Sequence, residues 1–261
     1  MFIDSHCHLI SPELQAQLPK ILAEMQAAQV DQAICICTTM EEFPGVAQLA
    51  ADHPQLWATV GVHPDNEDVH EPDVAELLLA AQNPKVVAIG ETGLDYYRLN
   101  GRSLDEMEWQ RERFRVHIRA ARAAKKPLVI HTRSSALDTL RVLDEEGGEQ
   151  VGGVFHCFTE SAEIALAAIE RGFYVSFSGI LTFKNAQALR DVAQVLPLEK
   201  LLIETDSPYL APVPYRGRLN SPAYVPYVAA ALAELKGCSV EELAAQTSAN
   251  CQRLFGLPQS V

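Results

Sequence analysis

The 261-residue sequence has no apolar run near the roughly 18 residues that a membrane-spanning helix needs, so we expect no membrane association. Its first residues, MFIDSHCHLI, lack a basic stretch followed by an apolar run, and we expect no secretory signal. The six cysteines include no CxxC pair, which is typical of free thiols in the cytoplasm. Positive charge is scarce, because 21 Lys and Arg residues face 34 Asp and Glu residues. The resulting net charge of −13 excludes a broad cationic surface for coating nucleic acid or lipid.

What the sequence does contain is an ordinary globular composition. Hydrophobic residues make up 48% of the chain and charged residues 21%, which excludes an intrinsically disordered protein. No Ser/Gly-rich linker or internal repeat interrupts the chain, and α/β barrels often reach about 250 residues as one unit. We therefore expect a single domain over residues 1–261, and we see no sign of an obligate protein partner.

Short apolar runs alternate with longer amphipathic stretches along the whole chain. The expected strands are 2–4, 33–38, 56–62, 86–90, 127–130, 153–155, 173–177 and 201–203. The expected helices are about 12–29, 40–52, 73–81, 104–124, 135–146, 161–171, 185–195, 222–235 and 239–254. Such alternation predicts an α/β fold with a parallel sheet, and eight strands favour a closed (β/α)8 TIM barrel. An open, doubly wound sheet is the alternative.

Titratable side chains gather where the expected strands end. They are His6 and His8 after the first strand, His63 after the third, Glu91 and Asp95 after the fourth, His131 after the fifth, His156 after the sixth, and Glu204 and Asp206 after the eighth. In a barrel, the carboxyl ends of all strands meet at one mouth, so these groups would face a common site. The alternative is a set of hydrogen-bonded histidines that bind no metal.

His6 and His8 are two residues apart, and on a strand such side chains point the same way and can bind one cation. Four histidines and two carboxylates exceed the needs of one tetrahedral ion and suit two divalent ions. We expect one ion on His6, His8 and Asp206, the other on His131 and His156, and Glu91 bridging them. These nitrogen and oxygen ligands suit Mg, Mn, Zn or Fe, and the sequence does not choose among them. Paired ions of this kind clamp the attacking and departing oxygens of a phosphoryl displacement.

Several motifs resemble the TatD family of metal-dependent deoxyribonucleases, most closely its YcfH-like branch. They are FIDSHCHL at 2–9, GVHP at 61–64, GETGLDY at 90–96, HTR at 131–133, HCF at 156–158, SFSGILTF at 176–183, ETDSPYLAP at 204–212 and RGRLNSP at 216–222. The resemblance implies a TIM barrel and cytosolic hydrolysis of DNA with divalent metals. It implies a ligand set formed by His6, His8, Glu91, His131, His156 and Asp206. Ile10 and Leu219 depart from the family pattern, and Leu219 puts the substrate preference in doubt because its loop is expected to meet the nucleotide.

Individual roles follow from these positions. We expect Asp206 to act as general base, with plain metal ligation as the alternative. His63 is expected to donate to a substrate phosphate, as the resemblance also suggests, or else to shape its loop. Arg133, two residues after His131, can hold a second phosphate with its planar fork, and Arg216 and Arg218 can follow a nucleic-acid backbone. The alternative for all three arginines is that they lie on the surface in contact with water and do not bind substrate.

The expected activity is divalent-metal-dependent cleavage of phosphodiester bonds in DNA, as a 3′–5′ exonuclease acting on single-stranded or frayed ends. A first alternative is a metal-dependent amidohydrolase, lactonase or phosphotriesterase with a small-molecule substrate. In that wider group a lysine often bridges the ions, whereas Glu91 takes the corresponding position here. A second alternative is a non-catalytic protein that binds metal or nucleic acid.

Overall fold

The computed structural model describes residues 1–258, and in them eight parallel strands form one sheet in the order β1 to β8. The strands are β1 (Phe2–Cys7), β2 (Val30–Cys35), β3 (Leu56–Val60), β4 (Val86–Asp95), β5 (Leu128–Arg133), β6 (Gly153–Phe155), β7 (Tyr174–Phe177) and β8 (Leu201–Ile203). Cys7 pairs in parallel with Ser207, just beyond β8, and the His8 N–H donates to the Ser207 carbonyl at 2.8 Å. These contacts bring the first and last strands together. The fold is therefore the predicted (β/α)8 barrel, nearly closed, and the open sheet is excluded.

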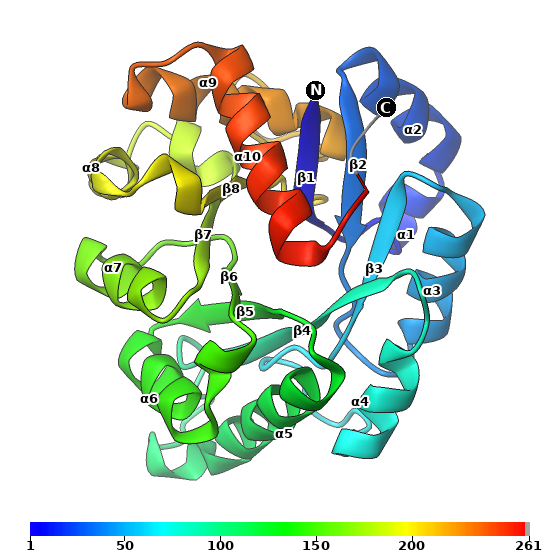
Figure 1. The fold of residues 1–261 in the computed structure, drawn as a ribbon, viewed down its shortest axis with the longest axis vertical. Helices are drawn as coiled ribbons and strands as arrows, with labels where there is room; N and C mark the ends of the chain where they lie inside the picture. Colours follow the sequence, from blue (N-terminus) through cyan, green and yellow to red (C-terminus); the bar gives the residue numbers. More distant parts are fainter. Residues whose placement is uncertain (259–261) are drawn as a thin grey trace.

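Helices surround the barrel (Figure 1). They are α1 (Pro12–Gln15), α2 (Leu18–Ala27), α3 (Phe43–Asp52), α4 (Val74–Ala81), α5 (Glu108–Ala124), α6 (Ala136–Glu146), α7 (Ala162–Glu170), α8 (Gln187–Val195), α9 (Val225–Lys236) and α10 (Val240–Phe255). Short 3-10 turns are η1 (Asp105–Met107), η2 (Gly148–Gln150), η3 (Gly179–Thr182), η4 (Leu198–Lys200) and η5 (Pro222–Tyr224). Ser239 and Glu242 form a capping box that starts α10. Among residues 1–258, no helix is long and apolar enough to cross a membrane, and the six cysteines are free.

Several predicted boundaries are wrong. The strand expected over 2–4 runs on to Cys7, so that His6 lies inside β1, and the strand expected over 33–38 is Val30–Cys35. The helix expected over 12–29 is split into α1 and α2, with Pro19 in the first turn of α2. Proline has no N–H to continue the helical hydrogen bonds of the preceding turn, so the helix restarts there. Strands β4 and β5 run on to Asp95 and Arg133, beyond the expected ends at 90 and 130.

Gly93 explains why β4 continues past its predicted end. Its φ is +132°, and a Cβ at this position would lie 2.0 Å from the His131 carbonyl oxygen. Only glycine allows the two backbones to approach so closely. Glu91 and His131 consequently stand inside paired strands rather than in the loops after them, which fixes their side chains more firmly than predicted.

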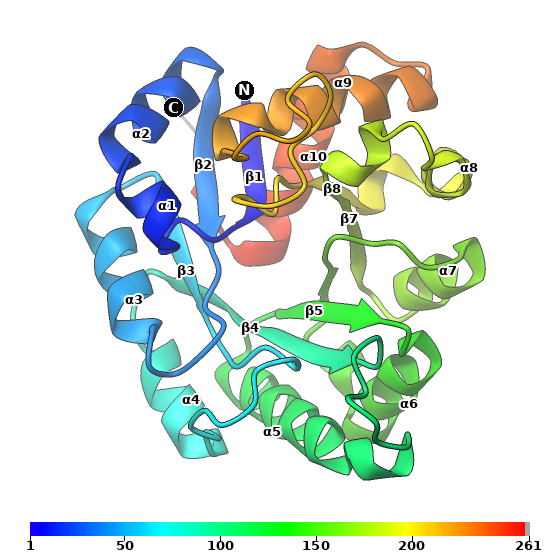
Figure 2. The same cartoon turned by 180° about the vertical axis from the view of Figure 1, so that it is seen from behind.

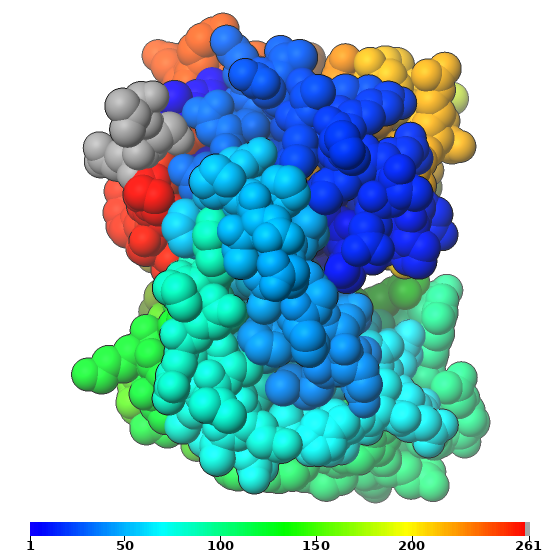
Figure 3. Space-filling view, turned by 90° about the vertical axis from the view of Figure 1, so that its right-hand side faces the viewer, coloured from blue at the N-terminus to red at the C-terminus, as the bar shows by residue number. Residues whose placement is uncertain are grey.

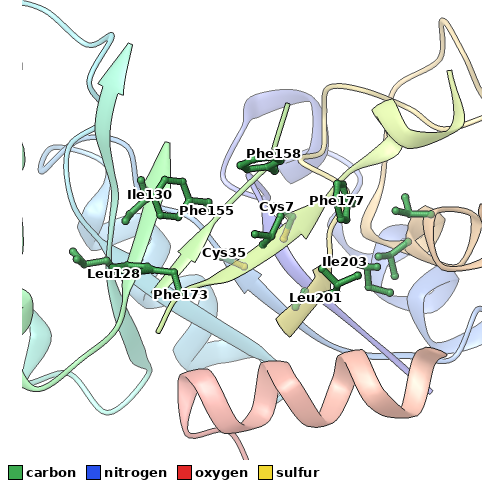
Figure 4. Close-up of a cluster of buried hydrophobic side chains, with 14 of the residues drawn as sticks. Cys7, Cys35, Leu128, Ile130, Phe155, Phe158, Phe173, Phe177, Leu201 and Ile203 are labelled. Atoms are coloured by element: carbon green, nitrogen blue, oxygen red, sulfur yellow. The ribbon is translucent and has the colours of Figure 1, made fainter. Parts of the chain in front are cut away.

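Apolar side chains fill both faces of the strands. One cluster joins the strands to the outer helices, and Figure 4 shows part of it, including Phe155, Phe173 and Phe177. A second cluster joins strand residues such as Ile34 to Phe255 of α10. The second cluster therefore links the strands to α10.

Helix α10 closes the end of the barrel where the strands begin. Asn250, which is fully buried, donates to the carbonyl oxygens of Leu198 and Leu201, both at 2.9 Å. Helix α10 lies in front of the strands in Figure 1, whereas in Figure 2 it lies behind and the loop that follows β8 lies in front. The opposite end is therefore left for the site.

Candidate metal centre

The predicted ligands meet at the carboxyl end of the strands, in a cleft of about 900 Å³. Its lining includes His8, His63, Glu91, His131, His156 and Asp206. In Figure 3 the surface is hollowed on its right side, between the blue N-terminal segment and the cyan to green segments below. Cleft residues Ser11 and Arg98 come from these two parts of the chain. The convergence predicted from the strand ends is therefore seen in the structure.

Glu91 stands at the centre of the cluster and is 2% exposed. Its Oε2 atom lies 3.3 Å from His6 Nε2 and 3.9 Å from His8 Nε2. Its Oε1 atom lies 3.3 Å from His63 Nε2, 3.2 Å from His131 Nδ1 and 2.8 Å from His156 Nε2. Each carboxylate oxygen thus faces a different group of histidines, which is the arrangement expected of a bridging ligand.

Asp206 joins the half of the cluster that faces Oε2. Its Oδ1 atom lies 3.3 Å from His8 Nε2 and 3.6 Å from His6 Nε2. The backbone positions it, because the Asp206 N–H donates to the His6 carbonyl oxygen at 2.9 Å. His6, His8 and Asp206 therefore lie together, but the His6 ring also stacks on the His156 ring with centroids 3.8 Å apart. The predicted division of the ligands between two ions remains a prediction.

The charges in the cluster depend on one another. Burial raises the pKa of the Glu91 carboxyl, but the charges of His156, His63 and His6 outweigh burial and hold the pKa well below its usual range. Burial lowers the pKa of His156, but Glu91 and Glu204 outweigh it and raise that pKa well above its usual value. Burial also raises the pKa of Asp206. The hydrogen bond to His8 and the charges of nearby histidines outweigh burial, so the pKa of Asp206 is lowered overall. Both acids therefore favour their ionised form beside these histidines.

Within residues 1–258, three groups of side chains could hold a metal ion: His6, His156 and Asp206; His6, His8 and Glu91; and His63, Glu91 and His131. His6 Nδ1 and His156 Nε2 are buried without a hydrogen-bond partner among the described residues. His156 Nε2 nevertheless lies 2.8 Å from Glu91 Oε1. Two lone pairs facing each other at this distance repel unless a proton or metal ion joins them. The nitrogen and oxygen donors thus fit a divalent cation.

His63 lies closer to the cluster than predicted. Besides its approach to Glu91, its Nε2 atom lies 3.2 Å from His131 Nδ1. On its other side, His63 Nδ1 accepts the Asp65 N–H at 3.0 Å. Its predicted contact with a substrate phosphate remains a prediction, although the ring does line the cleft.

The predicted arginines differ in position. Arg133 lines the cleft, and its guanidinium stacks 3.6 Å above the Tyr97 ring. Arg216 stacks 3.6 Å above Phe183, and Arg218 lies 5.9 Å from the Tyr215 ring. Neither Arg216 nor Arg218 is among the residues that line the cleft. Their contact with nucleic acid therefore remains a prediction about the surface outside the cleft.

Sequence reasoning missed Asp4, which is fully buried beneath the cluster. Its Oδ1 atom accepts the Thr205 N–H at 2.9 Å, and its Oδ2 atom accepts the Thr205 hydroxyl at 2.5 Å. Burial raises the pKa of Asp4 to about 8. Asp4 thereby ties β1 to the segment that carries Asp206. An acidic residue within an apolar run, two residues before an HxH motif, is the signal that could have identified it.

Two further carboxylates lie behind the ligand histidines. Asp95 Oδ2 lies 2.9 Å from His131 Nε2, and Glu204 Oε1 lies 3.3 Å from His156 Nδ1. From its position in the sequence, Glu204 could support the metal ligands from behind or cap a neighbouring turn. Asp95 could anchor its loop or touch substrate. Their role depends on which ring nitrogen faces the cluster, and spacing along the chain does not determine this.

Comparison with known proteins gives consistent matches over nearly the whole chain. Residues 3–256 match the family described as TatD related DNase. The uncharacterized metal-dependent hydrolase YcfH of Escherichia coli K12 is 44% identical, covering 99% of this chain and 97% of the relative. A 3′-5′ ssDNA/RNA exonuclease TatD of Citrobacter rodentium is 34% identical, with 97% of each chain covered. The crystal structure of YJJV, a TatD homolog from E. coli K12, has a TM-score of 0.91 at 30% identity, with 98% of each chain covered.

Proposed function

Since this chain belongs to the TatD-related DNase family, whose members include metal-dependent hydrolases, we propose that it cleaves phosphodiester bonds in DNA from a 3′ end. The observation that carries this proposal is Glu91, whose two oxygens face two separate groups of ligands. The relative from Citrobacter rodentium, named as a 3′-5′ exonuclease of ssDNA and RNA, supports the polarity. A single-stranded or frayed end reaches the mouth of a barrel more readily than the middle of a duplex.

Two divalent ions fit the cluster. His6, His8 and Asp206 would hold one, His131 and His156 the other, and Glu91 would contact both. When bound, such ions stabilise the negative charge that develops on the phosphoryl oxygens. Mg, Mn and Zn all suit these ligands, and thiolate plays no part because Cys157 in the cleft contacts Ser178 at 3.2 Å and burial raises its pKa.

Asp206 is the proposed general base. Its lowered pKa keeps the carboxylate ionised and ready to accept a proton from the attacking water. It lines the cleft, and its backbone N–H is held by His6, so its position is fixed. Glu91 serves as the bridging ligand and does not need to move a proton.

His63 and the arginines are the proposed substrate contacts. His63 Nδ1 accepts the Asp65 N–H, so a neutral ring carries its proton on Nε2 and can donate to a phosphate oxygen. Burial lowers the pKa of His63, which keeps the ring neutral. Arg133 would hold the next phosphate with a guanidinium oriented by Tyr97. Arg216 and Arg218 would attract the strand outside the cleft.

We place the protein in the cytoplasm. Its six cysteines are free, and three of them, Cys7, Cys35 and Cys37, are fully buried within the barrel wall. Such thiols persist where the surroundings are reducing. The proposed nucleic-acid substrate is also found there.

A small-molecule substrate is the second candidate, because a cleft of about 900 Å³ is also the size of a metabolite pocket. In that case the same residues would hydrolyse an amide, lactone or phosphotriester. A direct comparison of substrates separates the two functions.

The test uses metal-free protein, a single-stranded oligonucleotide labelled at its 5′ end, and added Mn, Mg or Zn. We expect the oligonucleotide to shorten from its 3′ end only when metal is present, and not when that end is blocked. Asp206→Asn should abolish shortening, whereas Asp144→Asn removes the same charge from an exposed surface pair with Arg171 and should not. Metal-independent cleavage would contradict the metal centre, unimpaired cleavage of the blocked strand would contradict the exonuclease, and turnover of only amides, lactones or phosphotriesters would favour the second candidate.

A further inference from the structure

Three histidines approach the same oxygen of Glu91, but each is held differently from behind. His63, His131 and His156 all place a ring nitrogen within 3.3 Å of Glu91 Oε1. A neutral imidazole has one N–H and one lone pair, so the partner of the far nitrogen decides which of them faces Glu91. For each histidine, the group bonded to the far nitrogen therefore shows which ring nitrogen carries the proton when the ring is neutral.

His131 is held by an acceptor. Asp95 Oδ2 lies 2.9 Å from His131 Nε2, and Asp95 is only 4% exposed. An ionised carboxylate accepts hydrogen bonds and donates none, so the proton of His131 lies on Nε2. The lone pair on Nδ1 then faces Glu91, where a metal ion would lie.

His156 is also held by an acceptor, through its other nitrogen. Glu204 Oε1 lies 3.3 Å from His156 Nδ1 and also accepts the Cys157 N–H at 2.8 Å. When the ring is neutral, as it must be to bind a metal ion, its proton therefore lies on Nδ1 and its lone pair on Nε2. This is the nitrogen that is buried without a hydrogen-bond partner, 2.8 Å from Glu91 Oε1.

His63 is held by a donor instead. The Asp65 N–H donates to His63 Nδ1 at 3.0 Å, so the ring proton lies on Nε2 and faces the cluster. A nitrogen that carries a proton cannot bind a metal ion. His63 is thus left outside the ligand set although it lies as close to Glu91 as His6 does.

We propose that Asp95 and Glu204 are positioning residues that make His131 and His156 metal ligands, while the Asp65 backbone makes His63 a hydrogen-bond donor. The inference rests on the metal centre of the proposed function. It applies to one half of the cluster, because His6 Nδ1 in the other half is buried with no partner in the described part of the chain. Loss of a positioning carboxylate should therefore weaken the binding of one ion and leave the binding of the other unchanged.

The two isosteric amide variants are expected to behave differently. Asp95 Oδ1 accepts the Tyr97 N–H at 2.9 Å, so in Asp95→Asn the amide oxygen stays there and the NH₂ group faces His131 Nε2. His131 then has to carry its proton on Nδ1, which blocks the ligand atom. In Glu204→Gln, one oxygen can still accept both N–H groups, because Glu204 Oε1 already does so. The first variant should be severe and the second mild.

Titration calorimetry of Zn²⁺ into the metal-free full chain measures the effect. We expect Asp95→Asn to weaken one of the two zinc sites about 10- to 100-fold and Glu204→Gln to weaken it less than about 10-fold. Asp144→Asn, the exposed control, should leave both sites unchanged. Unchanged zinc affinity in Asp95→Asn would overturn the inference, and if wild-type protein bound no zinc, the proposed metal centre itself would fail.

A second measurement needs no variant. Long-range ¹H–¹⁵N correlation spectra of the zinc-loaded wild-type protein report which ring nitrogen carries a proton. We expect the proton on Nε2 of His131, on Nδ1 of His156 and on Nε2 of His63. A proton on Nδ1 of His131, or on Nε2 of His156, would overturn the assignment even if Asp95→Asn failed to fold.

Discussion

The two ends of the barrel bury polar groups in opposite ways. At the closed end, Asn250 is fully buried and its amide donates to two backbone carbonyl oxygens. At the mouth, His6 Nδ1, His156 Nε2 and Glu204 Oε2 are equally buried but have no partner among the described residues. A buried polar group without a partner costs about 1–3 kcal/mol, so folding alone does not account for the mouth. The closed end is organised for stability and the mouth for a ligand that the chain does not supply.

Histidines give the same contrast. His117 of α5 is fully buried, accepts the Val62 N–H at 2.9 Å through Nε2 and contacts the Arg113 carbonyl at 2.8 Å through Nδ1. Burial lowers its pKa to about 4. His156 is similarly buried, yet its pKa is raised because Glu91 and Glu204 outweigh burial. The surroundings of His117 thus favour its neutral form, whereas the surroundings of His156 favour its charged form.

The largest effect should come from Glu91→Gln at the mouth. Glutamine cannot bridge two cations with two anionic oxygens, so kcat/KM on single-stranded DNA should fall at least about 10³-fold, or about 4 kcal/mol. The exposed variant Glu145→Gln, which removes the same charge from the surface, should retain full activity. Steady-state kinetics with added Mn measure both. Retention of more than a tenth of the activity in Glu91→Gln would contradict the bridging role.

The next largest effect is a loss of folding stability in acid, caused by His117 of α5. Because the pKa of His117 is about 4 in the folded protein and near 6.5 when unfolded, the unfolded chain binds the proton more strongly. Folding stability is therefore complete above pH 6.5 and falls as the pH drops toward 4, by up to about 3 kcal/mol. Urea unfolding of metal-free protein between pH 7 and 4.5 should show this loss.

The comparison variant is His117→Gln, which cannot titrate. Other histidines change charge over the same range, so the relevant quantity is the difference between wild type and this variant. The wild-type free energy of unfolding should fall more steeply with acid. If the free energies of unfolding of wild type and His117→Gln fell in parallel with decreasing pH, His117 would not contribute to the loss of stability in acid.

Replacing Asn250 at the closed end of the barrel, as in Asn250→Ala, should lower the stability of the protein. The change leaves the Leu198 and Leu201 carbonyl oxygens without this donor, and we expect a loss of about 2 kcal/mol in the free energy of unfolding. Because α10 lies at the far end from the cluster, zinc affinity of the folded protein should not change. Chemical unfolding and zinc titration of the same preparation test both statements. A weakened zinc site would show that the two ends are coupled.

The sequence was sufficient to predict the barrel and the meeting of these side chains at its mouth, for one physical reason. Strand ends converge in a parallel barrel, so polar residues that follow apolar runs, such as His131 and Asp206, must share a mouth. The extension of β4 was not predictable, because it depends on the close approach of Gly93 to the His131 backbone. For Asp95 and Glu204 the sequence leaves alternatives open, since their roles depend on ring orientation rather than on position along the chain.

The smallest predicted effect lies outside the cleft. Arg218 is exposed and does not line the cleft, so it can meet only the part of a strand that extends beyond the terminal nucleotides. Arg218→Ala should raise the Kd of a long oligonucleotide about two- to threefold, and the slope of log Kd against log salt should fall by about 0.7. A dinucleotide should bind unchanged, as should both ligands in the control Arg122→Ala on α5. Equal weakening of the dinucleotide would mean that Arg218 reaches the terminal nucleotides and that the loop after β8 belongs to the metal-binding mouth.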